Sequence, residues 1–186
     1  MVVFIIIGII LFFLVISIIV VYNGLIRKRQ YVKESWSNID VQLKRKGNVI
    51  PNLVDTIKMQ SAYEGDLLER LTKARSGIVS GTPQERLEAS DQLAKMIPNL
   101  YAVKESYPTL GANESFKNLM NEITDCEDKI TYARQRYNIC VNNLNVTVQT
   151  FPNNIVASLF NFRLEDYYEL DQQQRTNYDE LRVKNL

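Results

Sequence analysis

The fold is decided first by the stretch VVFIIIGIILFFLVISIIVVY at residues 2–22, which contains no charged residue and is interrupted only by Gly8, Ser17 and Tyr22. As a helix this stretch is about 31 Å long, close to the thickness of the hydrocarbon core of a bilayer. A cleaved signal peptide is the alternative, but it has basic residues before a shorter apolar run and a small-residue cleavage site. The stretch therefore predicts an uncleaved transmembrane anchor.

Basic residues follow this stretch within the window in which Lys and Arg decide membrane topology, namely Arg27, Lys28, Arg29 and Lys33. Only Met1 precedes the stretch. Because positive residues stay on the cytoplasmic side, we expect a single-pass protein of the cell membrane with its N-terminus outside and its body in the cytoplasm. The same basic cluster lies at the level of the lipid head groups, so it is predicted to form a membrane-surface site.

Beyond the anchor, apolar residues recur at alternating steps of four and three, which is the spacing of a helix that buries one stripe. The spacing predicts one helix over residues 32–78, a second over 82–107 and a third that ends at Phe151, followed by a short apolar stretch at 153–162. The predicted fold is all-α. It consists of an N-terminal transmembrane helix and an elongated antiparallel bundle of three long, coiled-coil-like helices, plus a short C-terminal helix or tail.

Local signals mark the boundaries of these helices. Thr82-Pro83-Gln84-Glu85 is a capping box with proline at the first helical position. Tyr107-Pro108 ends the second helix, because the residue before a proline avoids helical geometry, and Asn113 is a candidate N-cap for the third. The chain is accordingly predicted to divide into an anchor at 1–26, a helical bundle at 27–162 and a polar tail at 163–186.

Pro51 lies inside the first predicted helix and removes one of its backbone hydrogen bonds. Its ring would clash with the carbonyl of Gly47, whose missing side chain lets the backbone bend away. Gly47 and Pro51 are therefore predicted to form a helix kink, and a break into two helices is the alternative. The apolar spacing keeps its phase across the proline, which favours the kink.

The first predicted helix is longer than the second, at about 70 Å against about 39 Å. A second helix that runs antiparallel would return only part of the way to the membrane and leave an apolar stripe uncovered. Either the tail after Pro152 covers this stripe or a second copy of the chain does. We expect the second outcome, a homo-oligomer whose subunit interface is formed by Val32, Trp36, Ile39 and Leu43.

The composition excludes several kinds of chemistry. The 186 residues include no histidine, which removes Ser-His and Cys-His nucleophile pairs and histidine metal ligands. The 22 Lys and Arg residues balance 21 Asp and Glu residues, whereas a nucleic-acid binder is normally basic. Cys126 and Cys140 lie about 21 Å apart on one helix, too far for a disulfide. We therefore expect no enzyme, no cofactor, no catalytic or metal site and no nucleic-acid partner.

Two blocks in the first predicted helix carry a more specific pattern, WSNIDVQLKRK at residues 36–46 and VIPNLV at 49–54. With Lys73-Ala74-Arg75, Tyr107-Pro108 and Phe151-Pro152 in the same order and spacing, the chain resembles the LemA family of membrane-anchored bacterial proteins. The resemblance implies one N-terminal span, an elongated bundle of antiparallel helices and no established catalysis. Some members of the family are magnetosome proteins associated with membrane shaping, and others sit beside a membrane metalloprotease.

These observations lead to one main hypothesis and one alternative. The main hypothesis is a non-catalytic helical scaffold that self-associates at the inner face of the cytoplasmic membrane and organises or shapes that membrane. The alternative is an adaptor or regulator of a membrane protease or of a stress-response complex. The expected partners are the lipid bilayer, further copies of the chain and, under the alternative, a membrane protease or other membrane protein.

Overall fold

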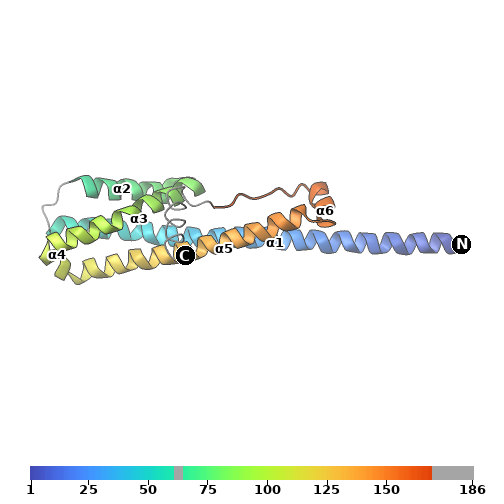
Figure 1. The fold of residues 1–186 in the computed structure, drawn as a ribbon, viewed down its shortest axis with the longest axis horizontal. Helices are drawn as coiled ribbons and strands as arrows, with labels where there is room; N and C mark the ends of the chain where they lie inside the picture. The colour runs from blue at the N-terminus through green and yellow to red at the C-terminus, as the bar shows by residue number, and fades with distance from the viewer. Residues whose placement is uncertain (61–64, 169–186) are drawn as a thin grey trace, which may run out of the picture. The chain divides into compact units, whose positions relative to one another are not determined.

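The computed structural model describes residues 1–60 and 65–168, and within these residues the regular structure is entirely helical (Figure 1). This confirms the predicted all-α fold. By its internal contacts the chain divides into two compact units, a terminal unit of residues 1–35 with 134–186 and a central unit of residues 36–133. The helices are α1 (Val2–Gln60), α2 (Gly65–Ser80), α3 (Pro83–Ser106), α4 (Pro108–Ala112), α5 (Glu114–Gln149) and α6 (Asn153–Leu159).

The central unit is built from antiparallel helical segments: the second half of α1, then α2, α3 and the first half of α5 (Figure 1). The short helix α4 joins α3 to α5. Each long segment carries apolar residues at helical spacing, so one of its faces can be buried against the others. The fully buried side chains include Leu53, Leu71, Leu93 and Ile123, one from each segment.

The prediction of one helix over residues 32–78 is wrong, because α1 ends at Gln60 and a separate helix begins at Gly65. α2 runs back alongside α1, so the chain reverses its direction once more than predicted (Figure 1). The apolar spacing keeps its phase across this reversal, so the spacing alone gives no sign of the change in direction. The residues between the two helices lie outside the described part of the chain.

The additional reversal also overturns the prediction of an uncovered apolar stripe. α5 runs antiparallel to α1 (Figure 1), and Ile39 and Leu43 are fully buried in the central unit of a single chain. In the terminal unit, Val32 is 5% exposed and packs against Val141 of α5. Trp36 is half-buried. Three of the four residues predicted to form a subunit interface are therefore core residues of one chain.

The helix boundaries follow the local signals. Thr82 caps α3 through a capping box in which its hydroxyl accepts from the Glu85 amide at 3.4 Å, and the Glu85 carboxylate accepts from the Thr82 amide at 2.7 Å. At the start of α5, the side-chain oxygen of Asn113 accepts from the Phe116 amide at 3.1 Å. α3 ends just before Tyr107-Pro108. These three predictions are confirmed.

α1 passes through Pro51 without a break, so the alternative of two helices at this point is wrong. A bend at Gly47 and Pro51 stays a prediction. Gly47 has a packing role, because a Cβ atom there would lie 3.2 Å from Val79 Cγ2 of α2. At Gly77 a Cβ atom would lie only 2.7 Å from the Ala89 Cβ of α3. These two glycines allow α1, α2 and α3 to approach one another closely.

Candidate functional site

The start of α1 is long and apolar enough to cross a membrane, judged by length and composition. None of the residues in its most apolar 18-residue window is buried. The core helix of a soluble domain would bury such a surface against its neighbours. Residues 2–22 therefore have the length, composition and exposure that a membrane anchor requires.

The basic residues of the predicted membrane-surface site follow on the same helix. Of these residues, Lys28 is half-buried, and the others are exposed: Arg27, Arg29 and Lys33. Arg27 Nε donates to the carbonyl of Asn23 at 3.4 Å. The guanidinium of Arg29 lies over the ring of Phe162, 5.1 Å from its centre. Their contact with lipid stays a prediction.

α6 packs against the end of the apolar segment within the terminal unit (Figure 1). Leu25 of α1 forms a buried cluster with Val156 and Ala157 of α6. The ring of Tyr22 lies 4.7 Å from that of Phe160, measured between centres. The sequence predicted a short apolar stretch here, and the contact considered for it was with the stripe that begins at Val32 and not with the end of the apolar segment. Partly buried residues around this cluster are Ile18, Val21, Tyr22, Val148 and Phe162.

Residues 163–168, which we call the strap, run along α5 in non-helical form (Figure 1). The side-chain amide of Asn145 donates to the carbonyl of Glu165 at 2.8 Å and accepts from the Glu165 amide at 2.9 Å. Asn138 makes the same pair of hydrogen bonds with Tyr168, both of 2.9 Å. Asn138 and Asn145 are about two helical turns apart on α5, and Glu165 and Tyr168 are three residues apart in extended chain. Both separations measure about 10 Å, so each asparagine lies opposite its partner in the strap.

Tyr137 adds a further attachment of the strap. Its hydroxyl donates to the backbone carbonyl of Asp166 at 3.2 Å. Burial raises the pKa of Tyr137, and the negative charges of Glu165 and Asp166 raise it further. The phenol therefore keeps the proton that it donates. The strap is the start of the predicted polar tail at 163–186, of which residues 169–186 lie outside the described part of the chain.

Arg134 lies beneath the end of the strap. Its guanidinium is 4.5 Å from the centre of the Tyr168 ring, a cation over an aromatic face. Arg134 is 7% exposed. The strap covers this side chain, so Arg134 does not lie on a solvated face. The neighbouring Tyr167 is exposed, and its hydroxyl donates to Asn142 Oδ1 at 3.1 Å.

Lys46 is fully buried in the central unit. Its ammonium donates to the carbonyl and hydroxyl of Ser90 at 3.0 and 2.9 Å and forms an ion pair with Glu127. A buried ammonium is costly unless it is paired and hydrogen-bonded, so these contacts specify how α1, α3 and α5 fit together. In the sequence Lys46 showed only as a break in the apolar spacing, because its partners lie far along the chain.

Asp40 connects α1 to the junction of α2 and α3. Its carboxylate forms ion pairs with Lys44, at 2.9 Å, and with Arg86. Arg86 Nε also donates to the carbonyl of Ile78 in α2 at 2.7 Å. Partial burial acts to raise the pKa of Asp40, but the hydrogen bonds and charges of Lys44 and Arg86 outweigh it and lower that pKa. This arrangement serves the packing of the central unit.

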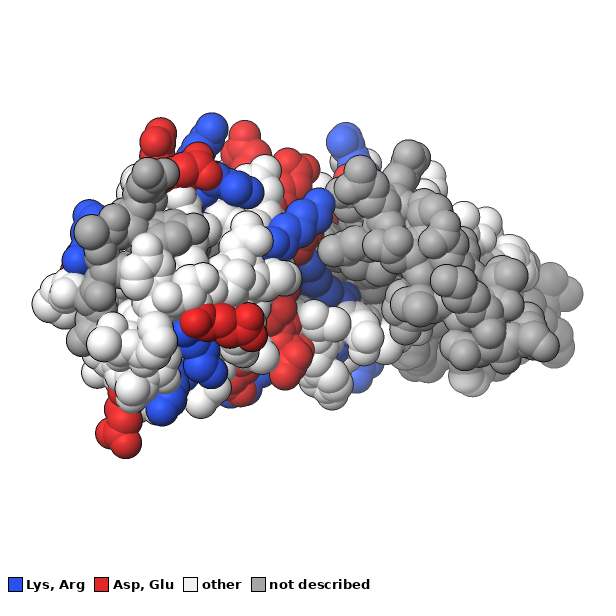
Figure 2. Space-filling view, turned by 60° about the vertical axis from the view of Figure 1, so that its left-hand side comes forward, with Lys and Arg blue, Asp and Glu red and all other residues white. Residues whose placement is uncertain are grey.

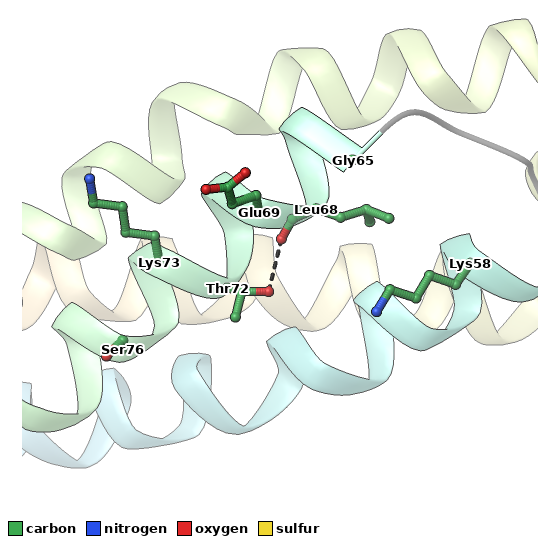
Figure 3. Close-up of a pocket in the computed structure, with 7 residues that line it drawn as sticks. All are labelled: Lys58, Gly65, Leu68, Glu69, Thr72, Lys73 and Ser76. Atoms are coloured by element: carbon green, nitrogen blue, oxygen red, sulfur yellow. Dashed lines mark hydrogen bonds between the residues drawn. The ribbon is translucent and has the colours of Figure 1, made fainter.

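An open hollow of about 570 Å³ lies between α1 and α2 (Figure 3). Every residue that lines the hollow is exposed except Leu68. The hydroxyl of Thr72 donates to the carbonyl of Leu68 in its own helix at 2.8 Å. A ligand site needs an enclosed apolar wall with converging polar groups, which this hollow lacks. Lys58 approaches the hollow from α1, and α2 supplies Gly65, Leu68, Glu69, Thr72, Lys73 and Ser76.

Charges of both signs lie close together on part of the surface. Figure 2 shows Lys and Arg side chains interspersed with Asp and Glu on the face in view, without an area of one sign. Arg45 pairs with Glu122 and with Asp125, both at 3.0 Å, and Lys129 pairs with Asp125 at 2.9 Å. Within residues 1–60 and 65–168, no group of three His, Cys, Asp or Glu side chains is placed to hold a metal ion.

Comparisons with known proteins agree with the arrangement of the chain. Residues 35–181 match a family model described as the LemA family. Magnetosome protein MamQ 2 of Paramagnetospirillum magneticum is 23% identical over 175 residues, which cover 80% of this chain and 64% of the relative. Magnetosome protein MamQ of Magnetospirillum gryphiswaldense is 22% identical over 174 residues, which cover 79% of this chain and 64% of the relative.

A further relative is similar over more of its own length. Protein LemA of Metamycoplasma hominis is 23% identical over 165 residues, which cover 88% of this chain and 75% of the relative. The chain spans only about 64% of the length of the magnetosome relatives that it matches.

Proposed function

The chain belongs to the LemA family, and from this membership we propose that it is a membrane-anchored, non-catalytic helical scaffold. The observation that carries the proposal is the exposed apolar helix at residues 2–22, which is long enough to cross a bilayer. An apolar surface of this size is stable in lipid and unfavourable in water. The relatives named as magnetosome and LemA proteins carry no enzyme name, which agrees with a scaffold.

The anchor continues directly into packed structure. Residues 2–22 pass into the remainder of α1 with no intervening loop. Leu25 packs against α6, and Val32 packs against α5, within four helical turns of the end of the apolar segment. A domain tied by a flexible linker would move freely beneath the membrane. The helix shared between the anchor and the terminal unit instead favours a fixed attachment at the membrane surface.

The proposed orientation has the N-terminus outside and the helical body in the cytoplasm. It is supported by Arg27, Lys28, Arg29 and Lys33, which follow the apolar segment closely. Positively charged residues near the end of a span are retained on the cytoplasmic side. In this orientation the basic cluster lies beside the anionic head groups of the inner leaflet.

The scaffold role includes self-association of copies within the membrane and organisation of the surrounding lipid. Anchoring confines the copies to two dimensions and raises their local concentration. The surface involved is not the stripe of Val32, Ile39 and Leu43, which a single chain already buries. The side chains of the apolar segment remain exposed along α1 and are available to a second copy inside the bilayer.

The mass of the full chain in detergent or in nanodiscs tests this proposal. A homomeric particle whose mass is a multiple of 21.5 kDa supports a self-associating scaffold. A complex that contains a membrane protease, isolated from cells under the same conditions, supports the adaptor role instead. A chain that stays strictly monomeric in membranes contradicts self-association.

A further inference from the structure

We propose that α6 and the turns on either side of it form a second membrane contact, inserted beside the anchor at the boundary between head groups and acyl chains. The proposal rests on the proposed function for the presence of the anchor in a bilayer. The proposal goes beyond that function because it identifies a second part of the chain that touches lipid. The ligand is the bilayer itself, recognised through apolar and aromatic side chains.

An uncharged stretch of sequence is the first observation. Residues 137–162, between Arg136 and Arg163, contain no Asp, Glu, Lys or Arg. In a chain with 23% charged residues, the N-terminal stretch that includes the anchor is the other run of this length. The stretch covers the last part of α5 and all of α6. Charged side chains are expensive at the depth of the acyl chains, so their absence suits α6, near the C-terminal end of this stretch, for that depth.

The depth of α6 follows from what it packs against. Its buried residues form a cluster that Ile18 and Val21 of α1 also contact. Both residues belong to the apolar segment that ends at Tyr22. Ile18 lies about 6 Å along the helix axis before Tyr22. When the anchor spans the bilayer, α6 therefore lies at the edge of the hydrocarbon region, the depth of interfacial helices, about 5–10 Å into the boundary.

α6 exposes large apolar side chains on part of its unburied surface, beside the exposed polar residues Asn154 and Ser158. Val156 and Ala157 face the cluster with Leu25, whereas Ile155 is 60% exposed and Leu159 is 70% exposed. These two residues are four positions apart and share one side of the helix. Phe151, in the turn that precedes α6, is 75% exposed. Large apolar side chains grouped in this way are unfavourable in water and favourable against acyl chains.

The surroundings of α6 match the layers of a bilayer boundary. The Tyr22 and Phe160 rings lie side by side, and aromatic rings of this kind gather at membrane–water interfaces. Arg29 lies over Phe162 at 5.1 Å, about two helical turns beyond Tyr22, at the level of the head groups. Apolar, aromatic and basic side chains thus follow one another in the order that a bilayer presents. Insertion from one side adds area to one leaflet, which gives a physical route to membrane shaping.

Fluorescence quenching by lipids tests this contact in the full chain. Cys126 and Cys140 are replaced, as C126A and C140S, and single cysteines are introduced as Ile155→Cys or Leu159→Cys. Each variant is labelled with an environment-sensitive fluorophore and reconstituted in phosphatidylcholine–phosphatidylglycerol vesicles. The vesicles carry a spin label either near the head group or near the end of the acyl chain. Ile139→Cys on α5 is the matched control, because Ile139 is an isoleucine of similar exposure, at 61%.

The shallow spin label is expected to quench the fluorophores at positions 155 and 159 more than the deep spin label does. Neither spin label is expected to quench the control fluorophore at position 139. An Ile10→Cys label reports on the anchor and is expected to respond most to the deep spin label. If the label at 10 responds and those at 155 and 159 behave like the control, the second contact is refuted while the anchor stands. Protection of 155 and 159 from water without quenching by lipid would assign this surface to a protein partner and also refute it. If the label at 10 does not respond either, the anchor itself is refuted.

Discussion

The side-chain amide of Asn145 and the backbone of Glu165 are joined by two hydrogen bonds, of 2.8 and 2.9 Å. An asparagine amide presents a donor and an acceptor side by side, as the edge of a neighbouring β-strand does. It can therefore pair with both main-chain groups of one residue in an extended segment. Asn138 repeats the arrangement with Tyr168. α5 thus holds the strap mainly through the strap's backbone.

Asn145→Ala should release the middle of the strap. Both hydrogen bonds to Glu165 are lost, each worth about 1 kcal/mol, so protection of the strap amides should fall roughly tenfold or more. Hydrogen exchange followed by mass spectrometry on the strap peptide measures this. Asn142→Ala is the matched control, because Asn142 contacts only the side chain of Tyr167 in the strap. Equal exchange in the two variants would contradict a backbone clamp.

Lys46→Ala should strongly destabilise the central unit. The substitution removes the ammonium from a buried network and leaves Glu127 and Ser90 without it, at a cost of about 3 kcal/mol. Lys44→Ala, which removes an ammonium from a side chain that is 67% exposed, should cost about 0.5 kcal/mol or less. Chemical unfolding in detergent, followed by far-UV circular dichroism, compares the two. Similar losses in both variants would show that Lys46 is not held as a buried partner.

Asp40 should contribute to the loss of stability in acid. Its pKa is lower in the folded chain than its ordinary value of 3.8, so it stabilises the fold above that value. This contribution is lost as the pH falls through the folded pKa, because protonation breaks the pairs with Lys44 and Arg86. The difference in unfolding free energy between the wild type and Asp40→Asn should therefore be constant near neutral pH and shrink below about pH 4. If the difference in unfolding free energy were the same near neutral pH and below pH 4, Asp40 would not be responsible for this loss of stability in acid.

Gly77→Ala should separate α2 from α3. The added Cβ would meet the Ala89 Cβ at 2.7 Å, and neither atom can move without its backbone, so the cost should be about 1–3 kcal/mol. Gly65→Ala on the same helix is the control, because nothing lies within 4 Å of its added Cβ. Thermal unfolding of the two variants measures the difference. A Gly77→Ala chain as stable as the Gly65→Ala chain would contradict the close packing of these helices.

The helix boundaries could be predicted because they depend on neighbouring residues. The Thr82 and Glu85 capping box and the Asn113 cap use side chains within three positions of the amides that they satisfy. The reversal between α1 and α2 was missed for the opposite reason. The apolar residues keep the same spacing on both sides of the reversal, so the spacing alone does not show that the chain has changed direction.

The candidate sites depend more on distant contacts and were predicted less well. The position of the basic cluster after the apolar segment can be read directly from the sequence. The burial of Ile39 and Leu43 depends on the direction of α5. Because the reversal between α1 and α2 was missed, the predicted direction of α5 was the opposite of the observed one. The strap was missed because asparagine side chains that bind backbone leave no periodic signal. Gln60 and Glu64, polar residues at positions where the apolar spacing continued, were the available hint of the reversal.

Alkaline extraction of membranes that contain the full chain tests membrane anchoring most directly. Anchoring by residues 2–22 predicts that the wild type stays with the lipid pellet and that Ile10→Arg combined with Leu14→Arg is extracted, because each arginine at this depth costs about 3 kcal/mol. Ile139→Arg combined with Val146→Arg, at exposed positions on α5, should stay in the pellet. Recovery of the wild-type chain in the alkaline supernatant would contradict the anchor.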